Sequence, residues 1–246
     1  MTGRVDRPRA MILAAGEGTR LRPLTLTVPK VMVEIGGVPL IDHQTSWLKR
    51  HGIREIAINL HHLGEKVQAH MGDGSAHGIR MAYSWEDVLL GTAGAVKKME
   101  PFFGQTLVVL YGDVLTDLPL SRVIEIHRAN RALATIVVME MEATGKGVIE
   151  LDASGRVTRF EEKPSDGARR SSLTNAGVYI LEKEALGYVP SSIPADFGYD
   201  VFPRMVRSGA RVFGFILSEN DYLVDIGTLD KYRQANADVR TGRLHT

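Results

Sequence analysis

Short apolar runs alternate with helix-compatible stretches along the first part of the chain. Several of the runs are apolar on both faces, as buried parallel strands are. The strand-like runs are residues 9–14, 55–60, 80–83, 106–111 and 134–139. The stretches between them that can form helices are 40–51, 65–71, 93–100 and 121–130. This alternation predicts βαβ units with right-handed crossovers and a doubly wound sheet.

Beyond about residue 140 three strand-like runs follow one another without a helix between them. They are residues 146–151, 156–161 and 175–181, with a tight turn at 153–155. The α/β order then returns with a helix at 199–208, strands at 212–217 and 222–224, and a helix at 228–239. We expect Asp200 and Thr228 to cap these two helices. The pattern therefore predicts an α/β fold with a mixed, doubly wound sheet and an inserted β-rich subdomain.

Composition and charge narrow the class of function. The chain has 30 basic and 29 acidic side chains, which gives no electrostatic basis for binding nucleic acid or a membrane surface. No apolar stretch approaches the roughly 20 residues of a membrane span, and the N-terminus has no signal-peptide core. We therefore expect a cytoplasmic protein with a small-molecule partner. Because cysteine is absent, any metal must be held by oxygen or imidazole.

The first predicted strand runs into a glycine-rich loop with the sequence AAGEGTRLRP, residues 14–23. Gly16 and Gly18 allow the backbone to approach an anion closely and to present amide groups to it. The loop differs from the dinucleotide-binding and P-loop patterns, but Arg20 and Lys30 add two cations that suit a phosphate. The alternative is an ordinary turn after a strand, with both cations in solvent.

The segment GEGTRLRPLT, followed by Pro29 and Lys30, resembles the signature of the sugar-phosphate nucleotidyltransferases. This family, also called the nucleotide-sugar pyrophosphorylases, joins a nucleoside triphosphate to a sugar 1-phosphate and releases pyrophosphate. Further matching segments are LLGTAGAV (89–96), YGDV (111–114), GVIELDASGRVTRFEEKP (147–164), NAGVY (175–179) and VDIGT (224–228). One departure is Val31, where many members have proline.

The resemblance implies a Rossmann-like fold and a division of the chain. Residues 9–240 would form the nucleotidyltransferase domain, between an N-terminal extension (1–8) and a tail (241–246). Within that domain, residues 9–140 would mainly bind the nucleotide and 141–225 the sugar phosphate. The end of the chain is too short for the β-helix that longer members append, so we expect a short form. A homodimer is also expected at the level of the family.

The resemblance assigns roles to the nucleotide side. Arg20, Lys30 and Asp113 are the expected catalytic residues, the two cations acting on the triphosphate and the leaving group. Asp113 and Asp225 both end strands, where open α/β sheets bind ligands, and the resemblance makes them ligands of Mg²⁺. The residues expected to contact the nucleotide are Leu13, Ala14, Ala15, Gly16, Gly18, Thr19, Gly91, Thr92 and Gly112.

The resemblance also assigns the sugar-phosphate side. Lys163 would hold the phosphate of the sugar 1-phosphate. Glu162 and Asn175 would hydrogen-bond to the sugar hydroxyls, and Gly147 would let the backbone meet the ring.

One short segment bears on the choice of nucleobase and sugar. The segment GTAG, residues 91–94, resembles the guanylyltransferase branch, which implies GTP and mannose 1-phosphate or a related sugar. A carboxylate at Glu86 or Asp87 could accept hydrogen bonds from guanine, although helix capping explains these acids and Thr92 nearly as well. Two alternatives remain. One is thymidylyl or uridylyl transfer to glucose 1-phosphate, and the other is a non-catalytic regulatory subunit that binds a nucleotide-sugar.

Overall fold

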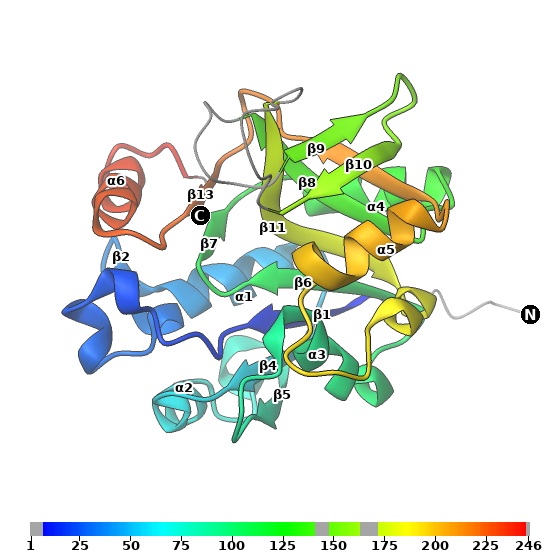
Figure 1. The fold of residues 1–246 in the computed structure, drawn as a ribbon. Coiled ribbons are helices and arrows are strands. Elements are labelled where there is room, and N and C mark those ends of the chain that lie inside the picture. The colour runs from blue at the N-terminus through cyan, green and yellow to red at the C-terminus, as the bar shows by residue number, and fades with distance from the viewer. Residues whose placement is uncertain (1–6, 141–147, 163–171, 245–246) are drawn as a thin grey trace, which may run out of the picture.

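The computed structural model describes residues 7–140, 148–162 and 172–244. Seven strands form a central sheet in the order β12-β8-β11-β6-β1-β4-β5 (Figure 1). They are β1 (Arg9–Leu13), β4 (Glu55–Leu60), β5 (Arg80–Trp85), β6 (Thr106–Tyr111), β8 (Ala134–Glu140), β11 (Leu173–Glu182) and β12 (Val212–Ile216). Neighbouring strands are parallel except at β11, which runs antiparallel to both β6 and β8. The predicted mixed α/β sheet is therefore confirmed.

Helices cover both faces of this sheet because its strands are apolar on both faces. The helices are α1 (Leu40–Arg50), α2 (Gly64–Met71), α3 (Gly91–Lys98), α4 (Leu120–Ala129), α5 (Phe202–Arg207) and α6 (Leu229–Arg240). In β1, Ala10 and Ile12 pack in a core with side chains of α1, α2 and α4. Met11 points to the other face and packs in a core with α3 and α5. The sheet is doubly wound, as predicted.

The inserted β-rich part is smaller than predicted. β9 (Val148–Leu151) and β10 (Val157–Glu161) pair with each other as a separate antiparallel sheet. The third predicted run does not join them but forms β11, inside the central sheet. Seven of the ten residues of β11 are buried, and a strand with two apolar faces needs cover on both.

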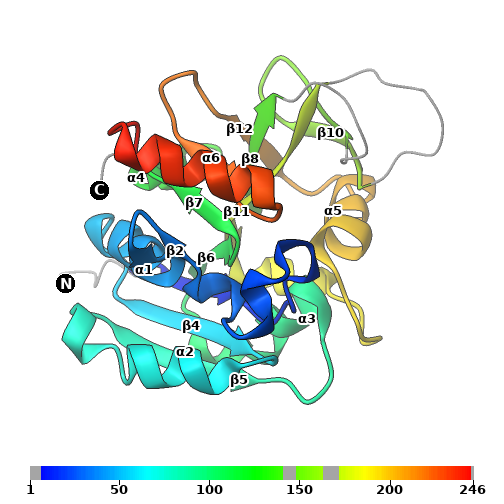
Figure 2. The same cartoon turned by 90° about the vertical axis from the view of Figure 1, so that its left-hand side faces the viewer.

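Smaller elements lie beside the central sheet. β2 (Glu34–Ile35) pairs with β3 (Val38–Pro39), and β7 (Val114–Thr116), which was not predicted, pairs with β13 (Leu223–Asp225). The 3₁₀ turns are η1 (Thr19–Leu21), η2 (Leu24–Leu26), η3 (Lys30–Met32), η4 (Ser75–His77), η5 (Glu100–Phe102) and η6 (Lys183–Tyr188). The first three lie between β1 and β2, in the segment that begins with the glycine-rich loop. Figure 2 shows this loop, in dark blue, on the same side of the molecule as α6.

One of the two predicted helix caps is wrong. Thr228 caps α6, its side chain accepting from the backbone N–H of Lys231. Asp200, however, lies inside a π-helical turn, η7 (Phe197–Val201), that precedes α5. The cap of that turn is Asp196, whose carboxylate accepts from the N–H of Gly198 at 2.8 Å. The helical conformation begins earlier than the sequence suggested, so the earlier aspartate caps it.

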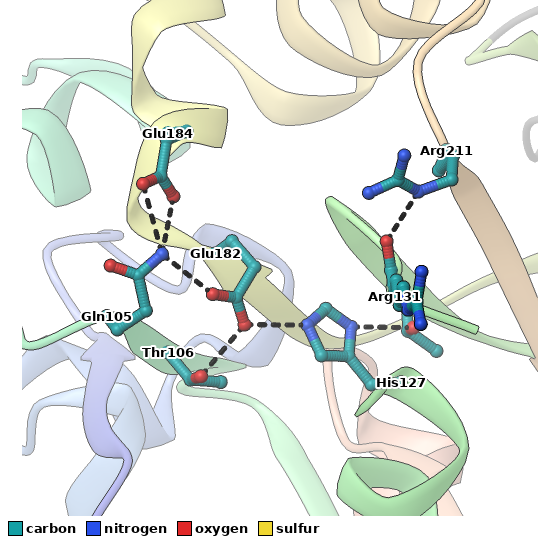
Figure 3. A network of polar contacts seen from close by, with 8 residues as sticks. Gln105, Thr106, His127, Arg131, Glu182, Glu184 and Arg211 are labelled. Carbon is teal, nitrogen blue, oxygen red and sulfur yellow. Dashed lines mark hydrogen bonds and ion pairs between the residues drawn. The ribbon is translucent and has the colours of Figure 1, made fainter. Parts of the chain in front are cut away.

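A polar network closes the amino edge of the central sheet, where β6 and β8 begin and β11 ends (Figure 3). His127 of α4 lies between Thr135 and Glu182, and Glu182 also accepts from the hydroxyl of Thr106 at 2.8 Å. Gln105 then joins Glu182 to Glu184.

Among the described residues, none of the helices combines the length and apolar character that crossing a bilayer requires.

Candidate active site

Two adjoining pockets open at the carboxyl edge of the sheet. The first, of about 260 Å³, is lined by Leu13, Ala14, Ala15, Gly16, Lys30, Val31, Asn59, Glu86, Leu89, Gly91, Thr92, Tyr111, Gly112, Asp113 and Asp196. The second, of about 560 Å³, is lined by Arg20, Tyr111, Asp113, Val114, Met139, Glu162, Thr174, Asn175, Ala176, Gly177, Leu223, Val224, Asp225, Lys231 and Gln234. Tyr111 and Asp113 belong to both, so the two pockets meet at the end of β6.

Gly112 allows β1 and β6 to end in close contact. Its N–H donates to the carbonyl oxygen of Leu13 at 2.9 Å. A Cβ at Gly112 would stand 2.5 Å from that same oxygen, so any larger residue would push the strand ends apart. The next residue, Asp113, is thereby held where the two pockets meet.

The antiparallel pair β7 and β13 brings the two predicted metal ligands together. Val114 lies opposite Asp225 in the pair, and the N–H of Ile226 donates to the carbonyl oxygen of Asp113 at 2.8 Å. Asp225 is oriented by the N–H of Gly227, which donates to its Oδ1 at 2.7 Å. The structure thus places carboxylates from two distant parts of the sequence at one wall of the second pocket.

Two cations face these carboxylates. Lys30 forms an ion pair with Asp113, and both side chains are largely buried. The guanidinium of Arg20 and the ammonium of Lys30 both approach Gly227. A Cβ there would lie 3.1 Å from a guanidinium nitrogen and 3.5 Å from Nζ. An arrangement of two cations and two carboxylates around one opening suits a phosphate ligand together with a divalent metal ion.

A chain of buried hydrogen bonds forms the floor of the first pocket. The N–H of Ala14 donates to Asn59 Oδ1 at 2.8 Å, and Asn59 Nδ2 donates to Glu86 Oε1 at 2.9 Å. Glu86 Oε2 accepts from the N–H of Leu90 at 3.0 Å. Glu86 is 4% exposed and lines the pocket, whereas Asp87 is exposed and does not. Of the two predicted carboxylates, Glu86 therefore lines the first pocket and Asp87 does not.

The start of α3 is joined to a segment about a hundred residues further along the chain. Gly91 has a φ of +78°, and a Cβ at this position would overlap the carbonyl oxygen of Ala195. Thr92 Oγ1 donates to Asp196 Oδ2 at 2.8 Å and accepts from the N–H of Phe197 at 2.9 Å. These contacts bring Asp196 into the wall of the first pocket, where the sequence had not suggested any role for it.

The second pocket contains the predicted sugar-phosphate residues that the structure describes. Glu162 and Asn175 both line it. The amide of Asn175 is fixed in place because its Nδ2 donates to the hydroxyl of Tyr179 at 2.7 Å. The other two predicted residues, Gly147 and Lys163, lie outside the described residues.

Tyr111 separates the two pockets. Its ring packs edge-on against Tyr179, with the ring centroids 5.6 Å apart. Burial raises the pKa of both hydroxyls above the usual tyrosine value. Tyr111 therefore stays neutral at the junction, as an apolar wall with a hydroxyl that can donate.

Gly18 and Thr19 are the two described nucleotide-binding candidates that line neither pocket. Gly18 has a φ of +65°, and its carbonyl oxygen accepts from the hydroxyl of Thr25 at 2.7 Å. Thr19 begins η1 and is exposed. In this structure both residues shape the loop. Their contact with a nucleotide stays a prediction.

The family is shown by comparison with known proteins. Residues 9–242 match the model of a family described as nucleotidyl transferase. UTP–glucose-1-phosphate uridylyltransferase of Synechocystis sp. is 38% identical over 242 residues, which cover 92% of this chain and 62% of that protein. Mannose-1-phosphate guanylyltransferase of Mycobacterium tuberculosis is 31% identical over 236 residues, covering 95% of this chain and 65% of that protein. The chain thus spans less than two thirds of these relatives.

The fold is also similar to that of a solved structure. A Bacillus anthracis protein, provisionally named a glucose-1-phosphate thymidylyltransferase and solved with sucrose, superposes with a TM-score of 0.83 at 25% identity. The match covers 95% of this chain and 96% of that one. Family model, relatives and fold agree over nearly all of the sequence, and the chain belongs to the nucleotidyl transferase family.

Proposed function

We propose that this chain transfers a nucleoside monophosphate from a nucleoside triphosphate to a sugar 1-phosphate and releases pyrophosphate. The observation that carries the proposal is the meeting of two pockets at Asp113. One is lined by the glycine-rich loop, and the other by residues of β11 and β13 and by Glu162, which follows β10. Residues 9–140 would then mainly bind the nucleotide and 141–225 the sugar phosphate. The reacting phosphates would meet at the shared wall.

The side chains around that wall suit the chemistry. A phosphate oxygen of the sugar 1-phosphate attacks the α-phosphorus, and the bond from that phosphorus to the oxygen bridging to the β-phosphate breaks. Negative charge develops on the departing pyrophosphate, where Arg20 and Lys30 would neutralise it. The nucleophile is already ionised at neutral pH, so no general base is required. Catalysis would rest on positioning and electrostatics.

Asp113 and Asp225 fit a magnesium ion. Mg²⁺ prefers oxygen ligands and usually takes only one or two carboxylates from the protein, the rest being phosphate oxygens and water. When bound, the ion would supply charge neutralisation at the phosphates. Lys30 forms an ion pair with Asp113, so a positive charge lies beside the carboxylate where the phosphates would bind. Removal of divalent metal with EDTA is expected to abolish turnover, and Mg²⁺ to restore it.

GTP and mannose 1-phosphate are the first candidate substrates. Glu86 supports GTP, because a carboxylate has about four acceptor positions, and among the described residues Asn59 and Leu90 each donate to one of its oxygens. Guanine offers an N1–H and an amino group, whereas uracil and thymine offer one such donor. The second candidate pair is UTP and glucose 1-phosphate. It is supported by the 38% identical uridylyltransferase, the more similar of the two relatives described above.

A substrate panel tests the proposal. Purified chain with Mg²⁺ is incubated with each of four nucleoside triphosphates and a set of sugar 1-phosphates, and released pyrophosphate is measured. Release with at least one pair is the expected result, and competition between triphosphates then assigns the base. Tight binding of a nucleotide-sugar without pyrophosphate release or exchange would contradict the proposal and favour the regulatory subunit.

A further inference from the structure

Three metal-ligating side chains converge away from both pockets. Asp42 lies in the first turn of α1, His70 in the last turn of α2 and His77 at the end of η4. One ligand atom from each falls within 4.8 Å of the others. None of the three lines either of the pockets described above. The catalytic site therefore does not explain why they lie together.

We propose that Asp42, His70 and His77 bind one divalent transition-metal ion, with Zn²⁺ as the best fit. Their separations support this assignment. Asp42 Oδ1 is 3.0 Å from His70 Nε2 and 3.7 Å from His77 Nδ1. Metal–nitrogen bonds of about 2.0–2.1 Å place neighbouring ligands of a tetrahedral ion about 3.4 Å apart. The observed distances bracket that value, and small rotations of the side chains would equalise them.

The chemistry of the donors selects the class of metal. Imidazole together with carboxylate suits zinc and neighbouring transition metals, whereas magnesium and calcium prefer oxygen alone. The three side chains keep 20–30% of their surface exposed, which leaves room for water as a fourth ligand. Because the chain has no cysteine, imidazole and carboxylate are the zinc ligands that its side chains offer. The site is thus distinct from the two carboxylates proposed for Mg²⁺.

Contacts of the Lys49 side chain and between the two imidazole rings hold His70 and His77 in place. Lys49 Nζ, from the same helix as Asp42, donates to the carbonyl oxygen of His77 at 2.8 Å. The His70 and His77 rings also contact each other, with centroids 5.7 Å apart. A bound ion would join α1, α2 and η4 by three bonds. Because zinc would bind only the folded chain in this geometry, it is expected to raise the melting temperature in a concentration-dependent way.

Calorimetric titration of the metal-stripped full chain with Zn²⁺ tests the proposal. Excess Mg²⁺ is present throughout, so that the carboxylates of the catalytic site are occupied. We expect one saturable zinc site per chain and a higher melting temperature with zinc. His70→Asn and His77→Asn should each weaken zinc binding by about tenfold or more. The matched control is His62→Asn, which changes an exposed histidine outside the cluster and should leave zinc binding unchanged.

Two results would overturn the proposal. One is the absence of saturable zinc binding to the wild-type chain, which would leave Asp42 and His70 as a hydrogen-bonded pair only. The other is unchanged affinity in the double variant His70→Asn/His77→Asn, which would place the zinc elsewhere. Circular dichroism of each variant establishes that it is folded, so a loss of binding can be assigned to the missing ligand. Neither readout depends on turnover, so the result stands whether or not the proposed activity is found.

Discussion

Strand β6 begins among polar side chains that bond to one another and ends among polar side chains that line two pockets. At its first residue, Thr106 donates to Glu182 inside a network whose members bond to one another (Figure 3). Its last residue, Tyr111, lines both pockets, as does Asp113 two residues later. The polar groups of the amino edge stabilise the fold, while those of the carboxyl edge face space that a ligand can fill. Activity and stability should therefore be separable by mutation.

The amino edge is closed by side chains that hydrogen-bond to one another. Glu182 Oε1 accepts from Thr106 Oγ1 at 2.8 Å and from His127 Nε2 at 3.1 Å, and its Oε2 accepts from Gln105. His127 Nδ1 lies 2.9 Å from the hydroxyl of Thr135. A neutral imidazole with its proton on Nε2 satisfies both contacts. These five side chains tie α4 and the ends of three strands together.

The largest expected effect is loss of activity at the carboxyl edge. Asp113→Asn removes the charge that pairs with Lys30 and would bind metal, so kcat should fall by about 10²–10³-fold. The free energy of unfolding should change little, because the variant keeps the backbone contact of residue 113 with Ile226. Pyrophosphate release and urea denaturation measure the two quantities.

The matched control for this variant is Asp230→Asn, at an almost fully exposed aspartate in the first turn of α6. It should keep full activity. Wild-type turnover in Asp113→Asn would show that the junction of the pockets is not the reacting centre.

The second prediction is the opposite result at the amino edge, a loss of stability with little change in activity. Glu182→Ala removes the carboxylate that accepts from Thr106, His127 and Gln105, which should cost about 1–3 kcal/mol of unfolding free energy. Turnover at 25 °C should stay within about twofold of wild type, since the network lies at the opposite end of the strands. Glu184→Ala, which removes an exposed carboxylate bonded to Gln105, should cost much less. A large fall in kcat with unchanged stability would contradict the separation of the two edges.

The third prediction concerns binding at the first pocket. Thr92→Val removes the hydroxyl that contacts Asp196 and the N–H of Phe197, and so loosens the wall formed by α3 and η7. The loss of about 1 kcal/mol should raise KM for the nucleoside triphosphate about fivefold, with a smaller change in kcat. Steady-state kinetics with the sugar phosphate saturating measures both. The control Thr241→Val alters an exposed threonine near the end of the chain and should change neither.

Runs of apolar residues predicted the strands of the central sheet better than the smaller elements beside it. The runs 55–60 and 106–111 are β4 and β6 with the expected ends, because strands buried on both faces leave an uninterrupted apolar signal. The short β7 gave no such signal, since its three residues depend on pairing with β13. The place of β11 in the central sheet also escaped prediction, because local sequence does not reveal which strand a run will pair with.

The site could be predicted where residues belong to a motif that follows a strand. Asp113 and Asp225 were expected at strand ends and lie together, although the antiparallel pairing of β7 with β13, outside the central sheet, is what brings them there. Asn59 and Asp196 were missed because their positions depend on partners 27 and 104 residues away. A polar residue near the end of the apolar run EIAINL was a signal for Asn59 that pattern reading could have used.

The smallest expected effect is a pH dependence of stability from the closed edge. Burial lowers the pKa of His127 below its usual value, Arg128 acts in the same direction, and Glu182 opposes both. The unfolded chain therefore binds a proton more readily than the folded chain as the pH falls below about 6.5. This histidine should make the free energy of unfolding decrease on acidification, with no such loss above the usual histidine pKa.

Urea denaturation at about pH 7.5 and about pH 5.5 measures this loss, since the first value lies above the usual histidine pKa and the second below it. His127→Gln should reduce the difference between the two pH values, whereas His62→Gln, at an exposed histidine, should leave it unchanged. The effect should be smaller than that of Glu182→Ala, because protonation leaves the side chains of the network in place. The contrary outcome is that acidification stabilises the wild-type protein relative to His127→Gln. That result would mean that the carboxylate of Glu182 outweighs burial, so that His127 is protonated in the folded chain and forms an ion pair with Glu182.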